Sequence, residues 1–323
     1  MALALITGAT GFIGSQVSLR ALQAGYRVRL TIRRKEQADK LRRIFADYEK
    51  HLEFAIVPDI TVSGCFDEAL QGVEYVLHLA SPLPTPDSED LVTPARRGTI
   101  NILESAAKVS SIKKVVITGS ALSLVPLGEP RNGLIVREDN EITYTLPPES
   151  TILTLPPMAR YHASKLAAHK ATLDFHSTNP PFDIITLHPV YVFGRNLVQE
   201  TTDDLGGSCG LLFQSLFSDT LVSKQFLGVH IDDVADAHLR VLDANVKGFR
   251  SFLLASETRS WGDVKRFVEE RYPGVVFSLR DDDTISYMTD AKRAERELGI
   301  AFKGLEVMVQ DVLNQQFELA ASK

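Results

Sequence analysis

Cysteine is scarce in this chain: only Cys65 and Cys209 occur among 323 residues, and they lie far apart. Two distant cysteines provide neither the spacing of a zinc site nor the dense framework of a small disulfide-stapled domain. We therefore expect two reduced thiols, buried or in loops. Long apolar runs are also missing: no stretch reaches the roughly 18 residues of a membrane helix, and no charged signal region precedes the first apolar run. The expected location is the cytoplasm, with no membrane partner.

An excess of basic residues is missing as well. Lys and Arg number 35 against 41 Asp and Glu, which gives a net charge of -6. A nucleic-acid-binding chain is expected to present a basic face, so we expect no nucleic-acid partner. The hydrophobic content of 44% and the charged content of 24% are ordinary for a globular enzyme. The length allows one large domain or two closely joined ones.

Apolar runs alternate with amphipathic stretches through the first half of the chain and beyond. This alternation is typical of βαβ units, so it predicts an α/β fold with a doubly wound parallel sheet, a Rossmann fold. A further strand is expected at 248–256, and helices are expected near 260–272, 290–298 and 305–320. The other expected strands are 2–6, 27–32, 52–57, 75–79, 113–118 and 183–188, separated by helices at 12–24, 36–49, 66–71, 91–109 and 158–177.

The sequence TGATGFIG at 7–14 follows the first apolar run and opens the first expected helix. In that context Gly8, Gly11 and Gly14 form a dinucleotide fingerprint. The glycines permit a tight turn, close approach of the backbone to a pyrophosphate, and packing of helix on strand, while the helix N-terminus offers free N–H groups. The expected dinucleotide-binding domain comprises residues 1–188 with about 228–256, and a smaller C-terminal substrate-binding lobe comprises 189–227 and 257–323.

The second expected strand ends in Arg33, Arg34 and Lys35, with no acidic residue before Glu36. An NAD enzyme is expected to carry an acidic residue here for the ribose 2′-hydroxyl. A 2′-phosphate would instead be bound by these cations, because Arg can fork onto its oxygens. The sequence therefore predicts NADP as the cofactor. For Arg34 and Lys35, a solvated helix start is an equally good interpretation.

Tyr161 and Lys165 in YHASK lie four residues apart, on one face of an expected helix. An ammonium beside a phenol favours the phenolate, so we expect the pKa of Tyr161 to move from about 10 toward the working pH. Ser120 follows the strand 113–118, where its hydroxyl could bond a substrate carbonyl oxygen as charge builds on it. The carboxyl ends of parallel strands share one edge, so Ser120 is expected beside the glycine loop.

Together these segments resemble the extended short-chain dehydrogenase/reductase family, also called the NAD-dependent epimerase/dehydratase superfamily. The resemblance is strongest to its dihydroflavonol reductase and fungal aldehyde/ketone reductase branch. It extends over essentially the whole chain. The segments that carry it are TGATGFIG, PDI at 58–60, HLASP at 78–82, GTINILES at 98–105, TGSA at 118–121, YHASK, and HPVYVFGR at 188–195.

The resemblance implies a catalytic triad of Ser120, Tyr161 and Lys165. Ser120 would orient the carbonyl, Tyr161 would be the general acid, and Lys165 would hold the nicotinamide ribose and tune the tyrosine. Gly119 stands where relatives often have a second serine, which leaves Ser120 as the simplest assignment and Ser123 as a less favoured substitute.

The resemblance also implies a set of cofactor contacts and leaves the role of Asn101, structural or proton relay, open. Relatives are monomers or homodimers, and the sequence does not separate these states. The implied cofactor-binding residues are Thr7, Gly8, Gly11, Phe12, Ile13, Gly14, Arg33, Lys40, Asp59, Ile60, Ala80, Ser81, Tyr161, Lys165, Pro189 and Val192.

The expected activity is NADPH-dependent reduction of a ketone or aldehyde, with hydride supplied by the nicotinamide. Six prolines between Thr118 and Tyr161 predict an irregular excursion with a short hairpin, and residues 190–227, with GGSCG at 206–210, are interpreted as a binding lid. An apolar pocket would suit an aromatic, alkyl or polyketide-like substrate. Its expected walls are Leu83, Leu122, Val190, Tyr191 and parts of 205–227.

Two alternatives use the same scaffold: a redox-neutral nucleotide-sugar epimerase or dehydratase that retains NAD, and a non-catalytic NADP-binding regulator. The basic end of the second strand disfavours the first, and the Tyr161–Lys165 pair disfavours the second.

Asp232 and Asp233 are interpreted as a helix N-cap and its dipole-complementing neighbour rather than as paired catalytic acids. Trp261 is expected to pack the C-terminal lobe. The histidines show no metal spacing, so no metal is expected. In particular, His162, His188, His230 and His238 are expected to be satisfied or exposed.

Overall fold

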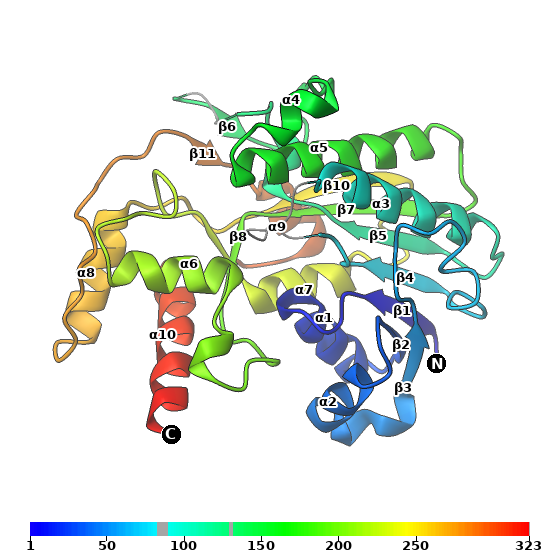
Figure 1. Ribbon diagram of the computed structural model, residues 1–323, viewed down its shortest axis with the longest axis horizontal. Helices are drawn as coiled ribbons and strands as arrows, with labels where there is room; N and C mark the ends of the chain where they lie inside the picture. The colour runs from blue at the N-terminus through cyan, green and yellow to red at the C-terminus, as the bar shows by residue number, and fades with distance from the viewer. Residues whose placement is uncertain (83–89, 129–131, 323) are drawn as a thin grey trace.

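A seven-stranded parallel sheet organises the molecule (Figure 1). The computed structural model describes residues 1–82, 90–128 and 132–322. The sheet confirms the six strands expected in the first 190 residues and the late strand. In the order β10-β7-β5-β4-β1-β2-β3, its strands are Phe249–Leu254, Asp183–Pro189, Lys114–Thr118, Tyr75–His78, Leu3–Thr7, Arg27–Ile32 and Leu52–Ile56.

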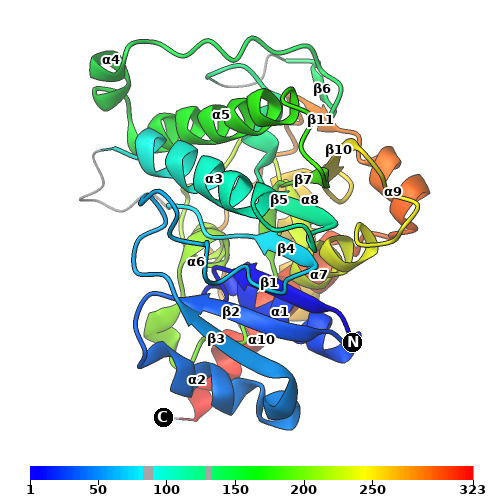
Figure 2. The same cartoon turned by 90° about the vertical axis from the view of Figure 1, so that its right-hand side faces the viewer.

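Helices cover both faces of this sheet, as the doubly wound prediction requires (Figure 2). α3 (Val92–Ala107) packs beside α5 (Pro157–His176) on one face, and α1 (Phe12–Gln23) packs beside α7 (Ile231–Arg240) on the other. The central strand β5 shows why its sequence is nearly all apolar: Val115 joins the core beneath α3, and Val116 joins the core of α1 and α7.

The strand order reverses between β1 and β4, so the chain leaves their carboxyl ends in opposite directions. Ligands of open α/β sheets bind in the crevice at such a point. The residues that follow β1, β4 and β5 therefore line one crevice.

Within the region predicted to form a smaller lobe, a hydrophobic cluster packs around Trp261, which is fully buried as expected. The Trp261 indole Nε1 donates to the Ser223 carbonyl at 2.9 Å. The helices of this lobe are α6 (Gly207–Leu216), α8 (Trp261–Arg271) and α10 (Leu305–Ala321). α9 (Lys292–Leu298) packs instead with β10 and α7, although it lies within the stretch assigned to the lobe.

Two expected helices differ from the structure. Residues 66–71 form turns between Gly64 and Gly72, which both have positive φ. A single helix-type bond, from the Leu70 N–H to the Phe66 carbonyl at 3.0 Å, joins residues four apart within this segment, and both side chains are buried. The helix expected at 36–49 divides into α2 (Gln37–Ile44) and the 3-10 turn η1 (Ala46–His51), with the buried Phe45 between them.

The expected hairpin after β5 is not found in the residues of this stretch that the structure describes. The short strand β6 (Ile135–Val136) pairs in parallel with the distant β11 (Met288–Thr289), a partner that local sequence does not reveal. The stretch 119–156 otherwise contains η2 (Ala121–Leu124) and α4 (Glu149–Leu153).

The segment 190–227, interpreted as a lid loop, contains a strand, a 3-10 turn and a helix between irregular stretches. β8 (Tyr191–Phe193) pairs with β9 (Gly228–His230), and η3 (Thr202–Asp204) follows β8. The GGSCG sequence does not form a loop: Gly206 is the N-cap of α6 and the other four residues are its first turn.

The N-cap of α7 is His230, not an aspartate. Its side chain accepts from the Asp232 N–H at 3.2 Å, and Asp232 and Asp233 occupy the first turn, where they complement the helix dipole. Lys303 Nζ lies 2.8 Å from Asp233 Oδ1, and Gln16 bonds Asp232 at 2.6 Å. Both carboxylates therefore have structural partners, as the non-catalytic interpretation requires.

Candidate active site

The glycine loop after β1 is shaped by two close backbone approaches. Gly8 has φ +74°, and a Cβ there would lie 2.9 Å from the Ala80 backbone N. A Cβ on Gly14 would lie 2.1 Å from the Gly8 carbonyl oxygen. Gly11, the N-cap of α1, offers no side chain, and the first turn of α1 holds no acidic residue. The N–H groups of this helix end are thus left to an anion.

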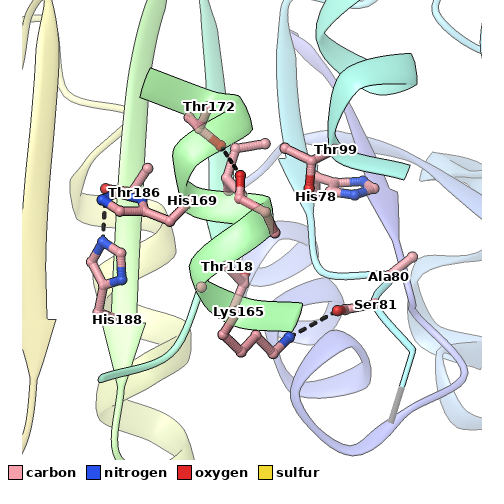
Figure 3. Close-up of a pocket in the computed structure, with 13 residues that line it drawn as sticks. His78, Ala80, Ser81, Thr99, Thr118, Lys165, His169, Thr172, Thr186 and His188 are labelled. Atoms are coloured by element: carbon pink, nitrogen blue, oxygen red, sulfur yellow. Dashed lines mark hydrogen bonds between the residues drawn. The ribbon is translucent and has the colours of Figure 1, made fainter. Parts of the chain in front are cut away.

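Thr7 connects this loop to the segment after β4 by hydrogen bonds. Its hydroxyl oxygen accepts from the backbone N–H groups of Leu79 and Ala80 at 3.0 and 2.9 Å, and lies 3.0 Å from His78 Nδ1. The arrangement fixes Ala80 and Ser81 at the crevice. Ser81 Oγ in turn accepts from Lys165 Nζ at 2.8 Å (Figure 3).

The structure brings Ser120, Tyr161 and Lys165 together. Ser120 follows β5 and is the N-cap of η2, and its hydroxyl accepts from the Leu122 N–H at 3.2 Å. Ser120 is also hydrogen-bonded to the Tyr161 side chain. Lys165, one turn along α5, has its Nζ 5.1 Å from the centre of the Tyr161 ring.

The sequence predicts a lowered pKa for Tyr161, and for the protein alone this prediction is wrong. Burial raises the pKa of Tyr161 to about 12, Tyr191 adds to the rise, and the Ser120 hydrogen bond opposes it. Burial also lowers the pKa of Lys165 to about 8. Desolvation is the largest cause of both shifts, because burial disfavours the phenolate and the ammonium alike. At neutral pH the phenol is therefore protonated.

Ser123, the other candidate serine, is already engaged. Its hydroxyl donates to the Ser120 carbonyl at 2.6 Å and lies 2.8 Å from His188 Nδ1. Packing explains why a glycine occupies position 119: a Cβ there would lie 2.9 Å from His188 Nδ1. A second serine at this position would collide with His188.

The opposite end of the crevice holds the residues implied for the adenine. Asp59 Oδ1 accepts from the Thr61 N–H at 2.8 Å, and that bond together with the nearby Arg33 charge lowers the Asp59 pKa. Asn101 donates its side-chain amide to the carbonyls of Ile60 and Val62 at 2.8 and 3.1 Å. Asn101 thus holds this loop in place, which corresponds to the structural role rather than the proton-relay role.

The cations expected at the 2′-phosphate lie on neighbouring elements. The Arg33 side chain is exposed directly after β2, and the Arg33 backbone N–H donates to the Gln37 side-chain oxygen at 2.9 Å. Lys40, on α2, has its Nζ 3.3 Å from Glu200, a residue of the segment after β8. Both side chains of this ion pair reach solvent, so the pair can exchange partners.

The nicotinamide end is bounded by the segment after β7. Pro189 ends β7, and Val192 is buried in β8, where its carbonyl accepts from Ser208. Of the expected pocket walls, Leu122, Val190 and Tyr191 are partly buried around this end, and Leu83 lies outside the described residues.

Sequence reasoning missed a group of buried histidines behind Lys165. His78, His169 and His188 line a cavity that also includes Lys165 and Ser81 (Figure 3). The available signal was the position of His169, four residues after Lys165 and therefore on the same helix face. In the described part of the chain no group of three or more His, Cys, Asp or Glu could hold a metal ion. None of the described helices is long and apolar enough to cross a membrane.

Comparison with known proteins identifies the family of this chain. The NAD dependent epimerase/dehydratase family model matches residues 4–255. The chain is 38% identical to ketoreductase sphI of Aspergillus fumigatus, covering 98% of each chain. Among solved structures it is similar to Gre2 of Candida albicans in complex with NADPH, with 26% identity, a TM-score of 0.85 and 99% of each chain covered. Yeast methylglyoxal/isovaleraldehyde reductase Gre2, also complexed with NADPH, shares the fold at 24% identity, with a TM-score of 0.87 and 100% of each chain covered.

Proposed function

Because this chain belongs to the NAD dependent epimerase/dehydratase family, we propose that it reduces a ketone or aldehyde to an alcohol with NADPH. The observation that carries the proposal is the meeting of Ser120, Tyr161 and Lys165 beside the glycine loop. The ketoreductase at 38% identity and the NADPH complex at 26% identity support the same reaction and cofactor.

The residues of the crevice fit a dinucleotide phosphate. The Gly11 backbone and the acid-free start of α1 suit a pyrophosphate, and the exposed Arg33 suits a 2′-phosphate. Lys40 would bind the 2′-phosphate in place of Glu200, since their ion pair is exposed. When bound, NADPH supplies the hydride.

The triad then supplies the proton and the orientation. Ser120 can donate its hydroxyl hydrogen to the carbonyl oxygen, because its bond from the Leu122 N–H uses only the oxygen lone pair. Tyr161 is protonated at neutral pH, since its pKa is about 12, and it acts as the acid. The nearby Lys165 cation stabilises the phenolate left behind, so the charge appears where a counter-charge already lies.

A panel of aldehydes and ketones, followed by NADPH absorbance with NADH in parallel, tests the proposal. We expect NADPH consumption with aromatic or alkyl carbonyls and much slower consumption of NADH. Tightly held NAD released from the purified protein, with no carbonyl reduced, would favour the epimerase or dehydratase alternative. The NADP-binding regulator would bind NADPH without consuming it.

Removing the 2′-phosphate cations should change cofactor choice. In the double variant Arg33→Ser and Lys40→Met, we expect the preference for NADPH over NADH in kcat/KM to fall about 100-fold, since a hydrogen bond to a charged group contributes roughly 1.5–3 kcal/mol. Arg34→Ser is the matched control for a neighbouring cation, with an expected change below about threefold. An unchanged preference in the double variant would contradict the assignment.

A further inference from the structure

A carboxylate from a distant part of the chain contacts a cation proposed for the 2′-phosphate. Glu200 belongs to the segment between β8 and α6, which reaches α2 (Figure 1). Its Oε2 lies 3.3 Å from Lys40 Nζ, and its Oε1 lies 3.7 Å from Arg43 Nη2. Each oxygen of this carboxylate therefore faces a different cation of α2.

The two cations are neighbours on the surface of α2. Lys40 and Arg43 are three residues apart on this helix, which places their side chains side by side. Gln37 lies one turn before Lys40, and its side chain accepts from the Arg33 backbone N–H at 2.9 Å. The cations thus continue from the end of β2, where Arg33 lies, along the first two turns of α2.

Hydrogen bonds fix the backbone that carries Glu200. The N–H groups of Glu200 and Thr201 both donate to Asp204 Oδ2, at 3.1 and 2.8 Å. Thr201 and Asp204 also form a capping box around η3. The Glu200 side chain therefore extends toward α2 from a turn whose backbone is fixed.

Side-chain amides connect the same segment to α10. Gln199 and Gln316 exchange two hydrogen bonds, at 3.0 and 3.1 Å, and both residues are buried. Gln315 accepts from the Asn196 N–H at 2.8 Å and donates to the Asn196 carbonyl at 2.9 Å. Glu200 is thus held by α10 through its backbone and contacts α2 through its carboxylate.

A second carboxylate nearby has a different role. Asp204 Oδ2 accepts three hydrogen bonds, from the Glu200 N–H and from the N–H and hydroxyl of Thr201. The Thr201 and Glu200 bonds lower the pKa of Asp204, and the Lys40 charge adds to this shift. Asp204 is therefore occupied within its own turn, whereas the Glu200 carboxylate faces the cations.

The ion pairs of Glu200 are weak enough to exchange. The side chains of Lys40, Arg43 and Glu200 are 35%, 69% and 59% exposed, so water screens both pairs and each contributes little. A phosphate monoester carries a charge of about −1.5 to −2 at neutral pH and offers three acceptor oxygens. A carboxylate carries a single charge on two oxygens. A 2′-phosphate can therefore take these cations from Glu200.

We propose that Glu200 competes with the 2′-phosphate of NADPH for Lys40 and Arg43, so that this carboxylate limits the affinity for the cofactor. The inference rests on the proposed function and adds Glu200 and Arg43 to the residues that select NADPH. On binding, the Glu200 carboxylate turns to solvent, and the phosphate oxygens accept from both cations in its place. NADH has no 2′-phosphate, so it leaves the pairs of Glu200 intact.

The variant Glu200→Gln tests the competition, because it keeps the size of the side chain and removes its charge. We expect the Kd for NADPH to fall about fivefold, the factor that two exposed ion pairs together can supply. The Kd for NADH should stay within about twofold of wild type. Fluorescence titration without a carbonyl substrate measures both constants. An unchanged or raised Kd for NADPH would overturn the proposal, and so would an equal gain for both cofactors, which would indicate a more open crevice.

The matched control is Asp39→Asn, which removes an exposed carboxylate from α2 itself. Asp39 pairs with Arg42 at 3.0 Å, so the variant changes the net charge by the same amount without touching the pairs of Glu200. We expect its Kd for NADPH to stay within about twofold of wild type. A gain equal to that of Glu200→Gln would make the effect one of overall charge and would overturn the proposal.

The Lys40→Met background distinguishes partner exchange from simple repulsion. Glu200 has lost its nearer partner in that protein, so the gain from Glu200→Gln should shrink to less than about twofold, as expected for residues that interact. A full fivefold gain there would show that Glu200 repels the phosphate directly, and partner exchange would be wrong. A wild-type protein that binds no NADPH would instead contradict the proposed function.

Discussion

Replacing Tyr161 with phenylalanine is expected to lower turnover about a thousandfold, within the range that general acid catalysis contributes. The variant removes one hydroxyl and keeps the ring that lies 5.1 Å from Lys165 Nζ. Hydride transfer then leaves an alkoxide without its proton donor. The dissociation constant for NADPH should stay within about threefold of wild type, because the proposed pyrophosphate and 2′-phosphate contacts lie elsewhere. Stopped-flow turnover and fluorescence titration measure the two quantities.

The matched control is Tyr26→Phe, which removes a phenol at the far end of β2, where Tyr26 packs edge-on to Tyr75. It should keep wild-type turnover. Turnover by the Tyr161→Phe protein within tenfold of wild type would show that another group donates the proton.

The second large effect concerns the glycine loop: Gly14→Ala is expected to destabilise the fold by about 3 kcal/mol, the upper range for overpacking. The added Cβ would lie 2.1 Å from the Gly8 oxygen, 2.6 Å from the Gly8 carbonyl carbon and 2.9 Å from the Ala9 nitrogen. These are backbone atoms, so the loop itself must move. For a chain of 323 residues the melting temperature should fall by about 4–5 °C.

The variant Gly11→Ala should weaken cofactor binding while leaving the stability of the fold nearly unchanged. Its added Cβ would meet only the Gly8 oxygen, at 3.4 Å, so the melting temperature should change by less than about 2 °C. The Cβ would nevertheless occupy the surface proposed for the pyrophosphate, and NADPH affinity should fall at least about tenfold. A Gly14→Ala protein as stable as wild type would contradict the packing account, and full affinity in Gly11→Ala would contradict the proposed cradle.

The sheet was predictable because its signals are local. A strand such as β5 is buried on both faces, so its sequence is apolar without alternation, and the glycines after β1 mark the turn into α1. The position of Ser120 beside the glycine loop was predictable for a similar reason, since a doubly wound sheet places the residues that follow its strands on one edge.

The remaining features depend on distant contacts. β6 pairs with β11, more than 150 residues later, and Lys40 pairs with Glu200, 160 residues away. The pKa of Tyr161 depends on how completely the fold removes the phenol from water, which the four-residue spacing to Lys165 does not reveal.

The cavity lined by histidines also depends on contacts between residues distant in the sequence. His78, His169 and His188 come from β4, α5 and β7, and only the packed sheet and helix bring them together. Helix spacing connects His169 with Lys165, but the sequence gives no reason to connect the three histidines with one another.

The central claim is that hydride passes from NADPH to a carbonyl carbon at this site. The most direct test supplies NADPH deuterated at the transferring C4 position together with the carbonyl panel, and analyses each alcohol by mass spectrometry. The account predicts one deuterium on the carbinol carbon for each NADPH oxidised. NADPH oxidation that leaves no deuterium in any alcohol would contradict it.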